Sequence, residues 1–215
     1  MIEALDGRDL AAAVRERVFV PLGMTDATFS PNAGQRFRMI PVHHRTADGG
    51  VIAGEIDLPP APELWAGGHG AYGTARDYGR FMAAMLNDGE LDGARILSPE
   101  TVALAFSDHL GGIAWPEVME SAAPEFSNDI TALPVKQGFG LGFHVVLEDL
   151  PGMRHAGTGD WAGLFNSYYW IDRASGVAGA FFTQVLPFFD LAIVQTALDV
   201  EQAVYSGVTA DAATA

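Results

Sequence analysis

Apolar residues recur at helical spacing near the start of the chain. Leu10, Val14 and Val18 follow one another at intervals of four, so they share one face of a helix. Asp9 stands where an N-cap is expected, and Pro21 has no backbone N–H to continue the helix. The pattern predicts a helix over residues 9–19.

A second apolar series predicts a helix that begins after Thr74. Thr74 and Asp77, three residues apart, resemble a capping box, and Gly89 lies where a C-terminal cap is expected. Loss of the Thr74 cap would cost about 1 kcal/mol. The side chains that follow at helical spacing are expected in the core: Tyr78, Phe81, Met82, Met85 and Leu86.

The segments around this helix carry weaker patterns. Residues 30–66 are rich in Pro, Gly and Asp without a sustained period, which indicates a loop with one or two short strands. Ser98 followed by Pro99 is typical of a third helix start, with Ser as the cap and Pro in the first turn. Residues 107–136 are again irregular.

From Gln137 the apolar period changes to two. Bulky residues alternate with glycines over 137–147, which predicts a strand with one bare face at its start. Two further strands are expected over 164–171 and 177–183, joined by a turn at 172–176. Residues 188–205 then predict a closing helix.

This order of elements predicts an α+β fold with helices packed on an antiparallel sheet. We interpret residues 1–215 as one partial domain. It comprises a helical and loop-rich region over 1–136, then antiparallel strands with the C-terminal helix over 137–206. The Ala-rich residues 207–215 are expected to form a frayed tail.

Acidic residues dominate the charge. Twelve Lys and Arg against 27 Asp and Glu give a formal net charge of −15, and Lys136 is the only lysine. Without a basic stripe the chain cannot neutralise a phosphate backbone, so we expect no nucleic-acid partner. The same charge would repel anionic membranes.

The chain has no cysteine, which excludes disulfides, thiolate nucleophiles and Cys-ligated zinc. Residues 1–6 have neither the basic nor the apolar part of a signal peptide. The apolar stretch 177–194 is interrupted by Thr183, Gln184, Pro187 and Asp190, so it is too broken to span a bilayer. We expect a soluble protein with no membrane partner. Its compartment stays open, because an export signal would precede Met1. The cytoplasm is weakly favoured.

Four segments in register carry a family resemblance. They are Arg17-x-x-x-Pro21-Leu22-Gly23-Met24-Thr25-Asp26-x-x-Phe29, then Gly67-Gly68-His69-Gly70 with Gly73-Thr74, then Gly138-Phe139-Gly140-Leu141-Gly142-Phe143, and Trp161-Ala162-Gly163 with Tyr169-Trp170-Ile171-Asp172. In order and spacing they resemble β-lactamase-related serine hydrolases, and the later ones resemble family VIII carboxylesterases. The resemblance implies the β-lactamase and penicillin-binding-protein transpeptidase fold, incomplete at its N-terminus.

The resemblance implies acyl-enzyme chemistry without a cofactor or metal. In that family a Ser-x-x-Lys motif supplies the nucleophile and its base, and a Tyr motif supplies a second proton relay. None of the eight serines of this chain is followed three positions later by lysine. A hydroxyl without a neighbouring base is a poor nucleophile near neutral pH. We therefore expect both motifs upstream of Met1, no catalytic residue in this chain, and no activity from the chain alone.

One wall of a substrate site remains. By the resemblance, Trp161-Ala162-Gly163 occupies the position of Lys-Thr-Gly in β-lactamases, where the strand edge binds the acyl group. The backbone N–H of Leu164 would then donate to the oxyanion, an interaction worth about 3 kcal/mol in the transition state. Trp161 replaces a cation that would pair with a lactam carboxylate, which favours uncharged esters. Ala162 and Asn166-Ser167 depart from the esterase pattern and affect the shape of the acyl pocket.

The histidines carry weaker hypotheses. His69 lies in the Gly-rich loop and, by the resemblance, at the rim of the substrate pocket, although an ordinary surface-loop histidine is the favoured explanation. His155 resembles a His-x-Gly motif, but its spacing to Trp170 is six residues too long. His43 and His44 offer no helical ligand pair, so we expect no metal site.

Three functions stay open at this point. The first is the C-terminal part of a carboxylesterase-like serine hydrolase that acts on small acyl esters, its partners being the ester and a complementing N-terminal segment. The second is a non-catalytic fragment that self-associates, as a homo-oligomer, or binds a partner through an uncovered strand edge. The third is a β-lactamase or D-amino peptidase of the same fold, which the absence of a cation at position 161 disfavours.

Overall fold

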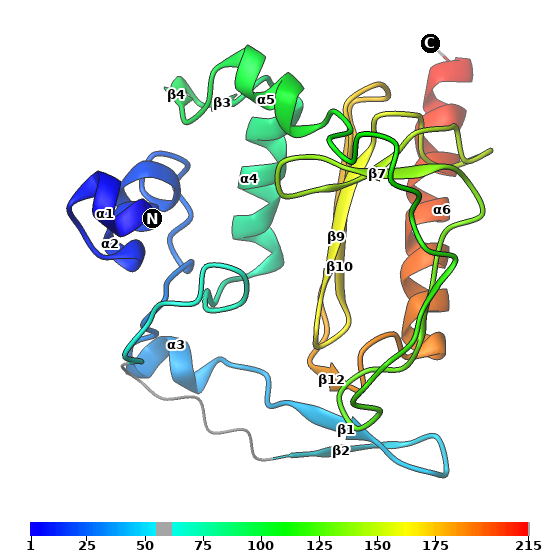
Figure 1. Cartoon of the computed structure of the whole chain (residues 1–215), viewed down its shortest axis with the longest axis horizontal. Helices are drawn as coiled ribbons and strands as arrows, with labels where there is room; N and C mark the ends of the chain where they lie inside the picture. The colour runs from blue at the N-terminus through cyan, green and yellow to red at the C-terminus, as the bar shows by residue number, and fades with distance from the viewer. Residues whose placement is uncertain (55–61, 215) are drawn as a thin grey trace.

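The computed structural model describes residues 1–54 and 62–214. Its main body has three layers: helix α4 (Ala75–Leu86), an antiparallel sheet, and helix α6 (Leu191–Thr214). Helix α4 packs against strands β10 and β11, while α6 lies on the opposite face of the sheet (Figure 1). The α+β class predicted from the sequence, with helices flanking an antiparallel sheet, is confirmed.

The main sheet has five antiparallel strands in the order β11-β10-β9-β8-β7. They are β7 Gln137–Phe139, β8 His144–Val146, β9 Gly159–Gly163, β10 Ser167–Asp172 and β11 Val177–Phe181. The strands predicted at 164–171 and 177–183 are thus present as β10 and β11, with the expected turn between them. The alternation of side chains along β10 places Ile171 in the core beneath α4 and Trp170 in a smaller cluster with Tyr205 of α6.

The prediction of one strand over 137–147 is wrong. Residues 137–146 form a hairpin in which Phe139 pairs with His144. Gly142 adopts a φ of 90°, a conformation that glycine reaches without steric cost, and the Gly140 N–H donates to Phe143 O at 2.8 Å. The alternation of bulky residues and glycines therefore belongs to a strand and a turn.

Caps begin the helices where the sequence predicts them. Asp9 accepts from Ala12 N–H ahead of α2 (Leu10–Val14), and Ser98 accepts from Thr101 N–H ahead of α5 (Pro99–Ala105). The predicted first helix continues after α2 as a π-helical stretch, η1 (Arg15–Phe19). A short helix α1 (Ile2–Asp6) precedes it.

Thr74 caps α4 by accepting from Asp77 N–H at 3.1 Å. The Asp77 side chain does not complete a capping box, because its carboxylate accepts from Asp26 N–H at 2.6 Å. Asp77 is buried, so this contact joins the start of α4 to the loop after η1. Met82 and Met85 are buried as predicted, and Tyr78, Phe81 and Leu86 pack partly buried against the same core.

The remaining elements are short. Residues 30–54 contain helix α3 (Ala33–Phe37), which the sequence pattern did not predict, and strands β1 (His43–Arg45) and β2 (Val51–Ala53), which match the expected short strands. Strand β1 also pairs in parallel with β12 (Val185–Leu186). Four strands of two residues each complete the described strands: β3 Glu90–Leu91, β4 Ala94–Arg95, β5 Val118–Met119 and β6 Ile130–Thr131.

Helix α6 is longer than the predicted 188–205. It begins at Leu191 and its backbone is helical to Thr214. The fraying expected for residues 207–215 stays a prediction. Within the described ranges, no helix has the length and apolar character needed to cross a membrane.

Candidate acyl-binding site

Trp161, Ala162 and Gly163 are the last three residues of β9, and Leu164 opens the turn into β10. Trp161 is 46% exposed and Leu164 is 49% exposed, although both are large and apolar. Residues 161–164 therefore lie together at one accessible end of the sheet.

One edge of β9 is open at this position. Strand β8 pairs with β9 only through His144–Asp160 and Val145–Gly159, so 161–163 have a strand neighbour in β10 alone among the described elements. Across the described chain the Leu164 N–H donates no hydrogen bond. An exposed strand edge followed by a free N–H is an arrangement that can bind an acyl group and its carbonyl oxygen.

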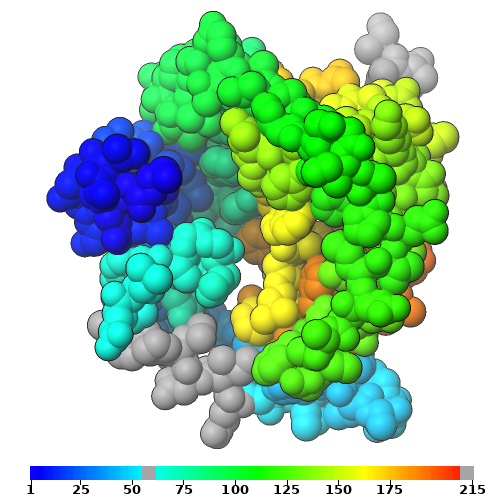
Figure 2. Space-filling view, in the orientation of Figure 1, coloured from blue at the N-terminus to red at the C-terminus, as the bar shows by residue number. Residues whose placement is uncertain are grey.

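Figure 2 shows the surroundings of this edge. The β9–β10 region (yellow) lies beside a hollow, with residues near 62–74 (cyan) across it and the 107–136 segment (green) along its other side. The strand edge is thus reachable from the hollow. The green segment forms the wall next to β9.

Asn166 fixes the tip of the β9–β10 hairpin. Its φ of 59° is tolerated by Asn better than by most residues, and its side chain is fully buried. Its Nδ2 donates to Val185 O and Pro187 O, each at 2.8 Å. Its Oδ1 accepts from Tyr168 Oη at 2.8 Å and from Asp190 N–H at 3.0 Å.

Thr183 adds a second attachment for the same turn. Its Oγ1 donates to Phe165 O at 2.7 Å and contacts Asn166 O at 3.0 Å, while Ser167 Oγ donates to Thr183 O at 3.0 Å. The backbone around Leu164 is therefore held against residues 183–190. In the sequence, Asn166-Ser167 stands out only as a departure from the esterase pattern, and an Asn before a strand is the one available signal of a positive φ.

Aromatic residues lie next to Trp161 on strands β7 and β10. Phe139 meets its ring edge-on, with centroids 5.3 Å apart and an interplanar angle of 85°. Tyr169, opposite Trp161 in β10, lies 4.9 Å from Tyr78 of α4, ring centre to ring centre. Burial raises the pKa of Tyr78 to about 12 and raises the pKa of Tyr169 as well. Both phenols stay protonated near neutral pH, so neither serves as a base.

A buried charge network holds β9 from behind. Arg154 donates to both oxygens of Glu201 on α6, at 2.6 and 2.8 Å, and also to Asp160, the residue before Trp161. Burial alone would lower the pKa of Arg154, but the two carboxylates outweigh it and raise that pKa. His144 Nδ1 lies 2.9 Å from Asp160 Oδ1. These partners are up to 47 residues apart, so sequence patterns did not reveal the network.

The place of His69 at the rim of the substrate pocket stays a prediction. His69 is exposed, in the turn closed by the Gly70 N–H to Ala66 O bond of 2.8 Å. His155 bonds to Asp172, at the end of β10 far from the Ser167–Gly163 pair. No cluster of three metal-binding side chains occurs in the part of the chain that the structure describes.

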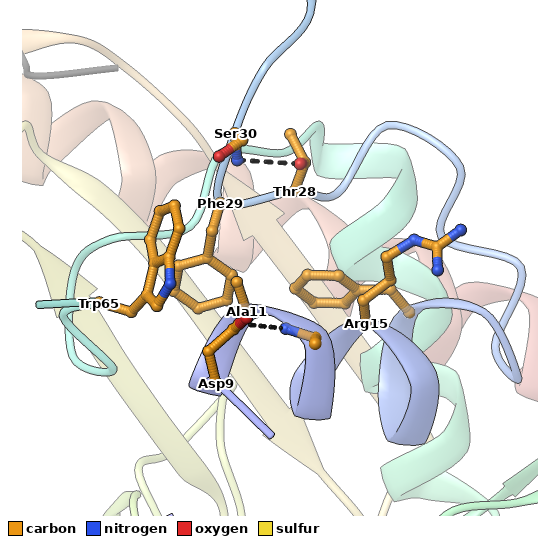
Figure 3. A pocket seen from close by; sticks show the side chains of 9 residues that line it. Asp9, Ala11, Arg15, Thr28, Phe29, Ser30 and Trp65 are labelled. Carbon is orange, nitrogen blue, oxygen red and sulfur yellow. Dashed lines mark hydrogen bonds between the residues drawn. The ribbon is translucent and has the colours of Figure 1, made fainter. Parts of the chain in front are cut away.

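A smaller pocket of about 240 Å³ lies near the N-terminus, beside Phe29 and Trp65 (Figure 3). Its polar groups are used within the chain, since Asp9 accepts from Ala12 N–H and Thr28 Oγ1 accepts from Ser30 N–H. The guanidinium of Arg15 points away from it. These polar groups therefore already have partners within the chain.

Comparison with known proteins shows the family to which this chain belongs. The chain belongs to the beta-lactamase family, whose model matches residues 1–203. The resemblance and the fold inferred from the four sequence segments are confirmed.

Three individual proteins illustrate the similarity. The chain is 30% identical over 194 residues to lovastatin esterase of Penicillium rubens, covering 83% of this chain and 46% of the relative. It is 28% identical to esterase EstB of Burkholderia gladioli, with 83% and 45% coverage. The LovD6 mutant of simvastatin synthase from Aspergillus terreus superposes with a TM-score of 0.80 at 25% identity, covering 97% of this chain and 52% of that one. The chain thus spans about half the length of the relatives it matches.

Proposed function

We propose that this chain is the C-terminal part of a carboxylesterase-like serine hydrolase that cleaves small acyl esters through an acyl-enzyme. In this proposal the open edge of β9 at Trp161, Ala162 and Gly163 binds the acyl group. The Leu164 N–H donates to the oxyanion. The observation that carries the proposal is this free N–H, at an exposed strand end that Asn166 holds in place.

Esters fit the site better than lactams or peptides with a carboxylate. Trp161 offers an apolar ring and one N–H donor where a cation would pair with an anion. The formal net charge of −15 further disfavours anionic substrates. Two of the relatives named above are esterases, which supports the same choice over a β-lactamase or D-amino peptidase.

The chain by itself is expected to be inactive. Its 215 residues contain no Ser-x-x-Lys, and burial keeps Tyr78 and Tyr169 protonated. Without an activated nucleophile the oxyanion donor has no tetrahedral intermediate to stabilise. A complementing N-terminal segment would supply the nucleophile, its base and the Tyr motif.

The test is hydrolysis of 4-nitrophenyl butyrate by the purified chain, with and without an N-terminal segment from a related esterase. We expect no turnover by the chain alone and turnover by the mixture. Trp161→Ala should lower kcat/KM of the mixture, whereas Trp65→Ala, whose ring lines the separate pocket beside Phe29, should leave it unchanged. Robust turnover by the chain alone would refute the proposal, and a β-lactam cleaved faster than the ester would refute the substrate class.

One observation favours the second candidate, a non-catalytic chain that binds itself or a partner. Strand β11 ends the sheet, with β10 as its only strand neighbour among the described elements. Large apolar residues are also exposed elsewhere, among them Phe37, Ile40 and Ile52. Such edges and patches recruit other chains. Sedimentation velocity decides the self-association: a monomer at every concentration would contradict it.

A further inference from the structure

An open pocket of about 750 Å³ lies between segments 108–117 and 131–137 and the residues that follow β8. Its volume falls within the range of small-molecule sites. Apolar side chains form much of its wall: Ile113, Trp115, Leu133, Pro134, Val135 and Leu147. Nothing in the sequence pattern of 107–136 indicated a binding site, because its walls come from separate irregular segments.

Aromatic contacts connect this pocket to the β9 edge. The Trp115 ring, in the pocket wall, stacks on Phe139 with centroids 6.2 Å apart and an interplanar angle of 7°. Phe139 in turn meets Trp161 at 5.3 Å. Two ring contacts therefore separate the pocket from the proposed acyl site. The 107–136 segment, which carries Trp115, borders the hollow beside β9 in Figure 2.

The charges around the pocket limit what it can hold. Its lining includes the carboxylates of Asp108, Glu117 and Glu148 against the single ammonium of Lys136. Asp108 Oδ1 accepts from Leu110 and Phe139 N–H, each at 3.1 Å, so this carboxylate is held in place in its charged form. An anionic ligand would meet more repulsion than attraction here.

We propose that this pocket binds the bulky apolar part of an uncharged ester whose carbonyl lies at the Leu164 N–H. The inference rests on the proposed function and names its substrate class: neutral esters with a large apolar group. Trp115 and Leu133 contact that group in the pocket. Phe139 and Trp161 line its path to the strand edge.

Binding to the intact chain tests this without requiring catalysis. The probe is 2-acetonaphthone, a neutral naphthyl ketone that contains no ester bond to cleave, titrated by calorimetry, with 2-naphthoate as the anionic comparison. We expect the ketone to bind more tightly than the acid. Trp115→Ala should raise the Kd of the ketone about tenfold, since it removes an aromatic wall of the pocket. Trp65→Ala, in the other aromatic-lined pocket, is the matched control and should bind as the parent chain does.

Leu133→Ser provides a second variant should Trp115→Ala fail to fold, as checked by far-UV circular dichroism. No binding of the ketone by the parent chain, equal binding of ketone and acid, or full binding by the folded pocket variants would each overturn the inference. If the ketone binds in a Trp115-dependent way but the chain mixed with the N-terminal segment hydrolyses no ester, the proposed esterase function is refuted and the pocket proposal stands. In the active mixture, Trp115→Ala should change the preference for naphthyl over methyl esters. An unchanged preference would refute the role of the pocket and leave the proposed esterase function standing.

Discussion

Replacement of Asn166 by Ala tests how the tip of the β9–β10 hairpin is held. The Asn166 side chain is fully buried and makes four hydrogen bonds, two as donor and two as acceptor. Truncation removes all four and leaves the partners on Tyr168, Val185, Pro187 and Asp190 without this bond. The substitution also places a Cβ-bearing residue without a polar side chain at a φ of 59°.

The magnitude follows from these contacts. A buried hydrogen bond contributes about 1 kcal/mol net, so the four together contribute about 4 kcal/mol. Ala in the left-handed region costs about 1 kcal/mol more. We therefore expect Asn166→Ala to lower the free energy of unfolding by about 4 to 5 kcal/mol. Asn166→Gly should be about 1 kcal/mol less severe, because glycine adopts this φ without strain.

The assay is urea unfolding followed by far-UV circular dichroism, with a thermal scan in parallel. For a domain of this size the expected loss corresponds to a fall in Tm of about 10 to 15 °C. Asn128→Ala is the matched control, because Asn128 is exposed and its side-chain amide makes a bond of 3.2 Å to Phe189 O. A loss below about 1 kcal/mol for Asn166→Ala, or equal losses for the two variants, would refute the reasoning.

Three further perturbations follow from the structure. Thr74→Ala removes the α4 cap and should cost about 1 kcal/mol in urea unfolding, while Thr74→Ser should retain most of it. Arg154→Met leaves the carboxylate of Glu201 buried without its partner, so the free energy of unfolding should fall by about 3 to 5 kcal/mol; a neutral effect would contradict the network. The hydrogen bond to Asp172 raises the pKa of His155 above its usual 6.5, so the pair stabilises the fold below about pH 6.5, and this contribution is lost as pH rises through the folded pKa. The stability difference between the parent and His155→Gln should therefore shrink between about pH 5.5 and about pH 8.5, and a constant difference would refute the linkage.

The helix starts were predictable because caps act over three residues. Each cap accepts from a backbone N–H three positions later, as Asp9, Thr74 and Ser98 do, so a short stretch of sequence is enough to predict it. The family resemblance likewise rested on short segments, whose order and spacing can be seen in a single sequence. Strand ends were less predictable, as the hairpin at 137–146 shows, since a glycine in an alternating pattern fits either a strand or a turn.

The sequence by itself determined the α+β class, the family and the position of Trp161-Ala162-Gly163, because each depends on residue types at short spacing. The tertiary structure decided which strand edge is open and which side chains hold it. The bonds of Asn166 to residues 185–190, the Arg154 bonds to Glu201 and the Trp115–Phe139 stack join residues 19 to 47 positions apart. Such contacts form only when the chain folds, since they depend on packing between elements that no local pattern encodes.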